Sequence, residues 1–144
     1  MLVAQGYLRE WSADGAIRPR EWEDADEIVP LVSAVVLSED DVAADLSGPR
    51  RWARNGCVYV TLAERGVLVL ERGKETTIAG YPAERVVDPT GAGDAFAAGL
   101  ALALADGRPA HDCARYANAV ASFAVEGIGM DGLADAERVA VRMA

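Results

Sequence analysis

The chain has 144 residues, 51% of them hydrophobic, and a formal net charge of −9. This length and apolar content suffice for one compact domain with a core, whereas the negative charge argues against nucleic acid or an anionic membrane as partner. Cys57 and Cys113 lack metal-ligand spacing, no secretory segment precedes them, and no apolar run reaches the roughly 18 residues of a membrane helix. We therefore expect a cytoplasmic chain with buried thiols.

The first part of the chain predicts short strands alternating with short helices. Leu2–Leu8 is strand-like, and Arg9–Pro19, with Asp14-Gly15 at its middle, predicts a hairpin. Asp24–Leu31 predicts a helix. Ala34–Leu37 is a continuous apolar run, typical of a parallel strand buried on both faces, and Ser38 after it is a suitable helix N-cap.

The middle of the chain predicts two more helices and then closely spaced strands. The helices are expected over residues 39–46 and 50–55, with a break at 47–49 and Gly56 as the C-terminal residue that stops the second. Short connections between strands favour antiparallel hairpins. The strands are expected at residues 58–63, 67–70 and 76–78.

The C-terminal part predicts helices. Ala95–Ala105 is apolar nearly all round, which indicates a buried helix. Pro109 suits the first turn of a helix that continues to about Glu126, and a closing helix is expected over 134–143 after a glycine-rich loop. Helices that alternate with parallel strands, with hairpins at one side, indicate an α/β fold with a mostly parallel sheet and an antiparallel edge.

The stretch Val86–Phe96 predicts a strand, a tight glycine turn and the start of the long apolar helix. Gly91 and Gly93 leave the backbone uncovered, so that amide N–H groups can converge on an anion beside the positive end of the helix dipole. Asp94 places a carboxylate next to that site, which is unfavourable unless the carboxylate accepts a proton. The alternative is that Asp94 only stabilises the helix N-terminus and the glycines only make the turn.

This stretch resembles the C-terminal signature of the PfkB/ribokinase family of small-molecule kinases. The family pattern is an Asp, a small residue or Pro, any residue, and then Gly-Ala-Gly-Asp, which Asp88–Asp94 matches. The resemblance implies that Asp94 is the catalytic base and that the amides of Gly91, Ala92 and Gly93 form an anion hole. It also implies a ribokinase-like, three-layer α/β fold.

Two further stretches are similar to the family's nucleotide-binding elements. Thr61–Gly66 resembles a Thr-Leu-Gly-x-x-Gly loop, in which Thr61 and Gly66 are kept and Ala63 stands where a glycine is usual. Asn118 lies where family members place an Asn near the adenine. Without the resemblance, the loop would be an ordinary hairpin turn and Asn118 a solvated residue on a helix face.

The resemblance also implies metal ions. Ser38 and Asp41 replace the family's Asn-x-x-Glu, which organises the Mg²⁺-bound phosphates, and Asp41 is the shorter acid. The alternative is that this acidic cluster only forms a helix N-terminus. Asp88 and Thr90 are implied ligands of a monovalent cation such as K⁺. His111 is given no chemical role.

The resemblance covers nearly all of this chain but only the C-terminal half of the family's length, so residues 1–144 are expected to form a single partial domain. The implied function is transfer of the γ-phosphoryl group of ATP to an alcohol of a sugar or polyol, with Mg²⁺. The alternative is a catalytically silent nucleotide-binding or assembly fragment whose exposed sheet edge pairs with another chain, either a copy of itself or the N-terminal half.

Overall fold

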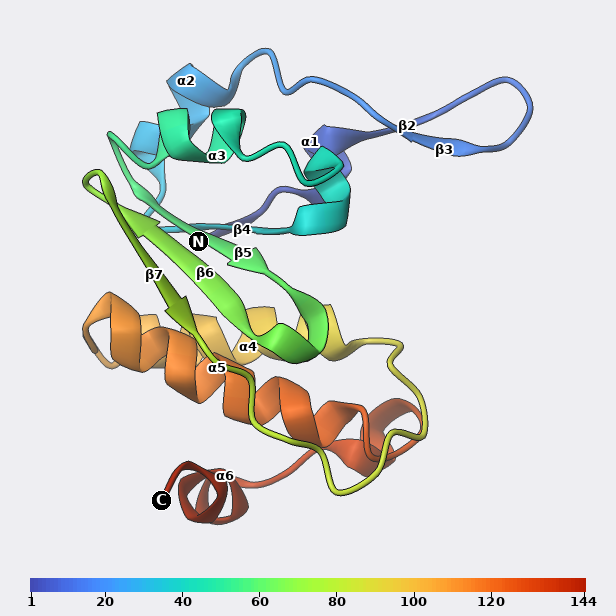
Figure 1. The fold of residues 1–144 in the computed structure, drawn as a ribbon, viewed down its shortest axis with the longest axis vertical. Coiled ribbons are helices and arrows are strands. Elements are labelled where there is room, and N and C mark those ends of the chain that lie inside the picture. The colour runs from blue at the N-terminus through green and yellow to red at the C-terminus, as the bar shows by residue number, and fades with distance from the viewer. The chain divides into compact units, whose positions relative to one another are not determined.

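The computed structural model describes residues 1–144, and the chain forms two compact units. The first unit consists of residues 1–62 and 68–76, and the second of residues 63–67 and 77–144. Figure 1 traces both along the chain. Residues 1–144 were expected to form a single partial domain. This stays a prediction, because the division into two compact units does not show whether each unit folds independently.

A five-stranded sheet has the order β1 (Leu2–Val3), β4 (Val35–Ser38), β5 (Cys57–Thr61), β6 (Val67–Glu71) and β7 (Lys74–Ile78). Strands β1, β4 and β5 are parallel, with Val35 opposite both Leu2 and Val58. Only Arg72 and Gly73 connect β6 to β7, and both have positive φ, as in the two-residue turns of antiparallel hairpins. The predicted α/β sheet with an antiparallel edge is therefore confirmed.

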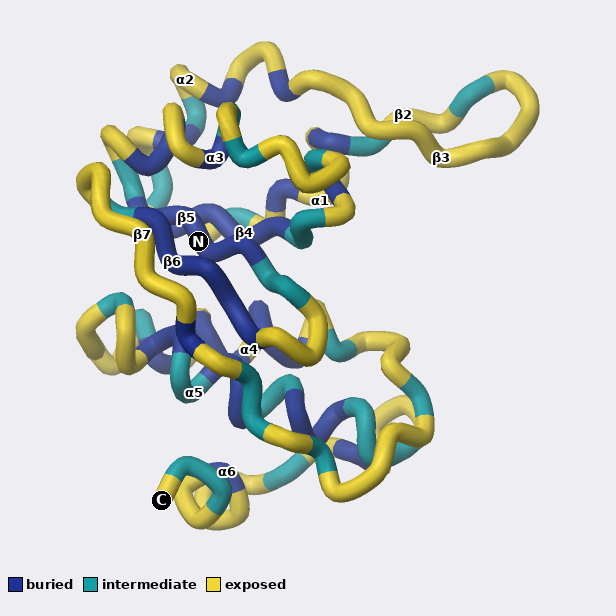
Figure 2. Tube along the Cα trace, viewed as in Figure 1, coloured by how far each residue is buried: buried dark blue, intermediate teal, exposed yellow.

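Alternate strand residues of the first unit face one hydrophobic core. Val35 and Leu37 of β4 belong to it, as do the matching residues of β5 and β6, and Val29 and Trp52 pack against them from the helical side. Strand β6 is buried along most of its length, whereas the first four residues of β7 are exposed (Figure 2). Charged and polar side chains on β7 suit a sheet edge, because they discourage pairing with another chain.

The helices of the first unit differ in extent from the prediction. The segment expected over 24–31 forms α2 (Ala25–Ile28) and a 3-10 turn, η1 (Val29–Leu31). The helix expected over 39–46 is only the 3-10 turn η2 (Glu39–Val42), because Ala43 and Ala44 adopt left-handed backbone angles that no helix can continue. Helix α3 (Ser47–Trp52) begins three residues before the expected start, since a proline is tolerated in a first turn.

The N-terminal segment is a strand only at Leu2–Val3, so the prediction of a strand over Leu2–Leu8 was wrong. Helix α1 (Gln5–Leu8) follows, because the Ala4 carbonyl accepts hydrogen bonds from the amides of Tyr7 and Leu8. The predicted hairpin is confirmed: β2 (Arg9–Trp11) and β3 (Ile17–Pro19) pair antiparallel as a separate two-stranded ribbon (Figure 1).

The second unit is largely helical. It contains α4 (Ala92–Ala105), α5 (Ala110–Ala124) and α6 (Ala136–Met143), and the short turns η3 (Ala63–Arg65) and η4 (Gly129–Gly132). Helix α4 lies close against α5 at Gly99, where a Cβ atom would come within 3.0 Å of Val120 Cγ2. Val139 of α6 packs with Phe123 of α5.

Helix α4 is not buried all round as its composition predicted. Ala95, Phe96 and Leu100 are buried, but Ala98 is exposed and Leu102 is 61% exposed. A run of alanines makes a helix apolar without requiring burial, because small side chains expose little surface. No helix in the structure combines the length and the apolar character needed to cross a bilayer.

Candidate active site

The segment from Asp88 to Asp94, called the glycine turn below, leads directly into α4. Gly91 is the N-cap residue and has φ +83°, a left-handed conformation that glycine adopts without strain. The Thr90 amide donates to Asp88 Oδ1 over 2.9 Å. This backbone hydrogen bond, with a further one from the Thr90 side chain, holds the pKa of Asp88 below its ordinary value. Asp88 and Thr90 thus form one compact turn.

Two of the three amides predicted to bind an anion are unpaired. The N–H groups of Gly91 and Gly93 have no acceptor within the chain, whereas the Ala92 N–H donates to the Pro89 carbonyl over 3.2 Å. Both glycines are exposed, and a Cβ on either would meet no atom within 4 Å. The turn therefore offers two unpaired donors and open space at the positive end of a 14-residue helix.

Asp94 lies in the first turn of α4, as predicted. Its side chain is exposed and takes part in no hydrogen bond or ion pair, so the carboxylate is free to act on a ligand. The strand expected at Val86 and Val87 is absent. The Val87 amide instead donates to the carbonyl of Val125 over 2.8 Å, so this segment bonds to a helix end and not to a neighbouring strand.

The end of α5 holds the segment that leads into the glycine turn. The Val125 carbonyl accepts from the amides of both Val87 and Asp88. One residue further on, Glu126 Oε1 accepts from the Glu84 amide over 2.7 Å and from Arg142 of α6 over 2.8 Å. The side chains of Glu126 and Arg142 are only 12% and 11% exposed, so this ion pair is little screened by water.

These supporting residues were missed by the sequence analysis. Arg142 also donates to Ser122 Oγ over 3.0 Å and stacks on the Phe123 ring, with its guanidinium carbon 3.4 Å from the ring centroid. One signal was present in the sequence: an arginine on the apolar side of an amphipathic closing helix indicates a buried partner, here Glu126.

Gly66 and Asn118 meet the same backbone segment, residues 78–80. Gly66 has φ +100°, and a Cβ there would lie 2.1 Å from the Ile78 carbonyl oxygen, so only glycine fits. Asn118 is buried, and its Nδ2 donates to the carbonyls of Ile78 and Ala79 over 3.1 and 3.0 Å. Both residues support this segment, and the expected contact of Asn118 with adenine stays a prediction.

In the loop before Gly66, Ala63 stands where the family usually has a glycine, and its backbone is strained. Ala63 has φ +53°, in the region that glycine adopts freely and alanine only with strain. Thr61 belongs to the other unit, at the end of β5, where its hydroxyl donates to the Leu37 carbonyl over a long 3.4 Å.

In the segment from Ser38 to Asp41, called the acidic turn below, each carboxylate oxygen of Asp41 has a hydrogen-bond partner. Asp41 Oδ2 accepts from the Ser38 amide over 2.8 Å, and the Ser38 hydroxyl accepts from the Asp40 amide over 3.2 Å, which together form a capping box. Asp41 Oδ1 accepts from Arg9 over 2.6 Å, and the Asp41 side chain is only 2% exposed. These contacts favour the structural alternative for Asp41.

The residues predicted to hold Mg²⁺ do not fit direct coordination. No group of three or more His, Cys, Asp or Glu side chains is close enough to hold a metal ion, and both carboxylate oxygens of Asp41 are engaged. Asp88 and Thr90 are better suited to a cation, because their oxygens lie together at an exposed turn. Oxygen ligands of this kind suit a hard cation.

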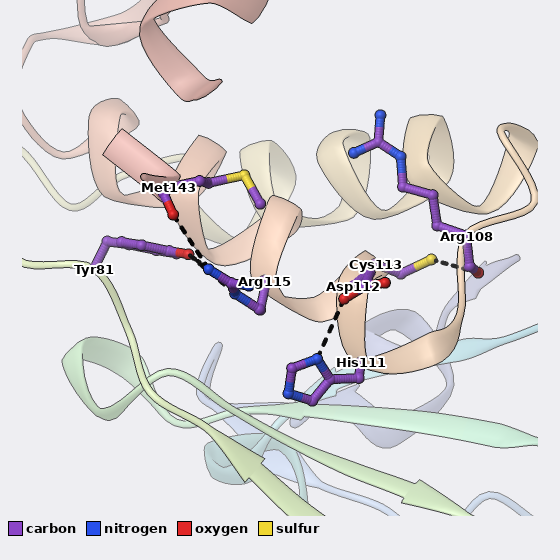
Figure 3. Close-up of polar contacts among 7 residues, drawn as sticks. All are labelled: Tyr81, Arg108, His111, Asp112, Cys113, Arg115 and Met143. Carbon is purple, nitrogen blue, oxygen red and sulfur yellow. Dashed lines mark hydrogen bonds and ion pairs between the residues drawn. The ribbon is translucent and has the colours of Figure 1, made fainter. Parts of the chain in front are cut away.

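A small recess of about 380 Å³ lies in the second unit, lined by residues 77–81, His111 and Arg115. Figure 3 shows Arg115 between Tyr81 and Met143: its Nη2 donates to the Tyr81 hydroxyl and to the Met143 carbonyl, each over 3.2 Å. The Arg115 guanidinium is therefore hydrogen-bonded to acceptors of the protein itself. His111 is exposed, and its side chain has one polar contact, with 3.4 Å between its Nδ1 and Asp112 Oδ1.

The chain is similar to known proteins over most of its length. The pattern of the pfkB family carbohydrate kinases matches residues 8–136. The inositol 3-kinase of Zea mays is 35% identical over 132 residues, which are 90% of this chain and 34% of that protein.

Solved structures give the same result. The ribokinase of Arabidopsis thaliana, solved with ribose and ATP, is 26% identical and aligns with a TM-score of 0.72 over 82% of this chain and 43% of its own. A ribokinase-type protein from Escherichia coli, solved with ATP and Mg²⁺, is 25% identical, with a TM-score of 0.71 over 81% of this chain and 41% of that one.

These likenesses confirm the ribokinase-like α/β fold. The chain spans less than half the length of the relatives that it matches. Since the family pattern covers most of the chain, with the glycine turn inside it, the chain belongs to the pfkB family of carbohydrate kinases.

Proposed function

We propose that this chain is the nucleotide-binding and catalytic part of an ATP-dependent kinase that phosphorylates an alcohol of a sugar or sugar-like molecule. The observation that carries the proposal is the glycine turn, where two unpaired amides and a free carboxylate lie together at the start of α4. Unpaired donors at a helix N-terminus suit phosphate oxygens, and a free carboxylate suits a proton acceptor.

The proposed reaction is an in-line displacement. Asp94 accepts the proton of the acceptor hydroxyl, the hydroxyl oxygen bonds to the γ-phosphorus, and the bond from that phosphorus to the ADP oxygen breaks. The Gly91 and Gly93 amides donate to the transferring group, with Ala92 as a third donor if it releases Pro89. Such preorganised donors stabilise the charge that develops during transfer.

The nucleotide is proposed to lie against the loop from Thr61 to Gly66 and the last helices, with Asn118 beside the adenine. The support for this placement is the segment 78–80, against which Gly66 lies closely and to which Asn118 donates two hydrogen bonds. Mg²⁺ would neutralise phosphate charge, held by the phosphates and water, because Asp41 has no free oxygen to offer. Asp88 and Thr90 are the proposed ligands of a monovalent cation.

The acceptor class rests on the relatives. One relative is named an inositol 3-kinase and another is solved with ribose, which supports a small polyol or sugar as acceptor. Catalysis needs the acceptor hydroxyl held roughly 3 Å from the phosphorus. We propose that the longer relatives supply this binding with the part of their length that has no counterpart in this chain.

The test is transfer of labelled γ-phosphate from ATP to a panel of sugars, nucleosides and inositols. We expect turnover from the chain joined to an N-terminal segment that completes the ribokinase fold, and none from the 144-residue chain. In the joined protein, Asp94→Asn is expected to lower kcat by about 10²-fold or more, with ATP affinity within a few-fold.

Two results would contradict the proposal. Unchanged turnover by the Asp94→Asn protein would show that Asp94 only stabilises a helix end. Absence of turnover on every acceptor, with the joined protein folded and binding ATP, would favour the alternative of a catalytically silent nucleotide-binding or assembly domain.

A further inference from the structure

Helix α6 packs against the end of α5 and contributes an arginine that the proposed reaction does not use. Arg142 donates from Nη2 to Glu126 Oε1 over 2.8 Å and from Nη1 to Ser122 Oγ over 3.0 Å. Its guanidinium also stacks on the Phe123 ring, so one side chain contacts three residues at a single helix end. The side chains of Arg142 and Glu126 are 11% and 12% exposed. Water therefore screens their attraction only weakly.

Glu126 connects this ion pair to the segment before the glycine turn. Its Oε1, the atom that binds Arg142, also accepts from the Glu84 amide over 2.7 Å. One guanidinium and one backbone amide thus share a single carboxylate oxygen. Without Arg142, the carboxylate would be a nearly buried charge with one neutral donor, which favours a side-chain orientation toward water. Arg142 therefore stabilises the orientation of Glu126 that the Glu84 amide needs.

The same segment has a second attachment that α6 completes. Arg115 of α5 donates both to the Tyr81 hydroxyl and to the carbonyl of Met143, the last residue of α6 (Figure 3). Tyr81 also packs against the small core that contains Phe123 and Val139. The segment that leads to the glycine turn is thus held at residues 81 and 84 by groups at the contact of α5 with α6.

Beyond these attachments, three hydrogen bonds lead to the proposed anion site. The Val125 carbonyl accepts from the amides of Val87 and Asp88, and Asp88 Oδ1 accepts from the Thr90 amide. The next residue is Gly91, whose own amide is unpaired. The backbone that carries the unpaired amides therefore depends on the position of residues 125 and 126 at the end of α5.

We infer that Arg142 is a positioning residue for the glycine turn, on which it acts through Glu126 and the segment 84–88. It keeps the Gly91 and Gly93 amides in the arrangement that an anion binds. That an anion binds there rests on the proposed function, whereas the attachment of the segment to α6 does not. Backbone donors bind an anion well when they are held in place beforehand, because ordering them on binding costs affinity. Loss of Arg142 therefore weakens anion binding through geometry and not through a lost contact with the ligand.

The test compares two arginines of α6 in the full 144-residue chain. Arg138 lies one turn before Arg142, and its guanidinium carbon also lies over the Phe123 ring, 4.8 Å from the centroid. Its side chain forms no ion pair and does not bond to Glu126. Arg138→Gln and Arg142→Gln therefore each remove one positive charge and one ring contact, but only Arg142→Gln breaks the link to Glu126.

Two nuclear magnetic resonance readouts follow the effect. In Arg142→Gln we expect the Glu84 amide proton signal to move upfield, as a weakened hydrogen bond requires, and its exchange with solvent to become about tenfold faster. Sulfate binding at the signals of residues 91–94 should weaken about fivefold, whereas Arg138→Gln should change neither readout by more than about twofold. Arg142→Lys keeps a positive charge within reach of Glu126 and should restore sulfate affinity to within about twofold of the native value.

A double variant shows whether Arg142 acts through Glu126. Glu126→Gln can still accept from the Glu84 amide but no longer attracts the guanidinium, so it should weaken sulfate binding about as much as Arg142→Gln does. The two substitutions together should cause no further loss, because the effects of residues that act through one another do not add. Losses that multiply would contradict the inference, since they would mean that the two side chains act independently.

Three further results would overturn the inference: an unchanged Glu84 signal in Arg142→Gln, sulfate affinity equal to that of the native chain in this variant, or an equal loss of affinity in Arg138→Gln. Absence of sulfate binding by the native chain is a different outcome. It would contradict the anion site and with it the proposed function, while the Glu84 signal would still decide whether Arg142 holds the segment.

Discussion

The acidic turn and the glycine turn are both short acidic segments at the start of a helical element, yet they are built in opposite ways. In the acidic turn, Asp41 is buried and both of its carboxylate oxygens have partners. In the glycine turn, Asp94 is exposed and free, and two neighbouring amides have no acceptor. A buried carboxylate with a partner for each oxygen stabilises the fold, whereas an exposed carboxylate and unpaired amides are available to a ligand.

The largest expected effect on stability comes from replacing the carboxylate of each turn with an amide. Asp41→Asn leaves Arg9 without its charged partner and should lower the free energy of unfolding by about 2 to 3 kcal/mol. Asp94→Asn should lower it by only about 0.5 kcal/mol, the loss of a favourable charge at a helix N-terminus. Urea denaturation of both variants checks the difference, and equal losses would refute the contrast between the two turns.

The next largest effects come from two alanine variants of the glycine turn, one of which tests backbone strain and the other access of an anion. Gly91→Ala forces alanine to φ +83° and should cost about 1 to 2 kcal/mol. Gly93→Ala places a methyl group in open space at a helical position and should not destabilise the chain. Its methyl group would, however, crowd an anion at the amides.

Sulfate titration followed by the amide signals of residues 91–94 supplies the second readout. We expect Gly93→Ala to weaken sulfate binding although its stability is unchanged. Undiminished sulfate binding in this variant, or no binding by the native chain, would show that the amides do not form an anion site.

The smallest effect concerns the nucleotide loop. Ala63→Gly relieves a left-handed alanine and should raise the free energy of unfolding by about 0.5 to 1 kcal/mol, after allowing for the greater freedom of glycine in the unfolded chain. Ala98→Gly, at an exposed position inside α4, is the matched control and should cost about 1 kcal/mol. A loss of stability in both variants would mean that Ala63 is unstrained.

The fold was predictable where local pattern and tertiary contacts agree. The continuous apolar run before Ser38 gave a parallel strand, and the turn residues Asp14-Gly15 gave a hairpin. The prediction failed where a local preference met a different partner: Val86 and Val87 favour a strand, but the amide of Val87 bonds to a helix end. Ala43 and Ala44 favour a helix and are left-handed.

The candidate site was predictable in its motif but not in its supports. The spacing of Gly91, Gly93 and Asp94 indicated the turn and the start of α4. The bonds that saturate Asp41 arise from Arg9, which is 32 residues distant in sequence, and no spacing rule predicts such a pairing. The same holds for Asn118, whose carbonyl partners are about 40 residues away.

The hydrogen bonds from Val87 and Asp88 to the Val125 carbonyl tie the glycine turn to the last turn of α5. Helix ends fray more readily than helix middles, and local unfolding proceeds in contiguous units. Fraying of α5 at Val125 would therefore release both amides in one event, and the approach to the turn would lose its attachment. The mobility of the proposed anion site would then follow that of a helix end more than 30 residues away in sequence.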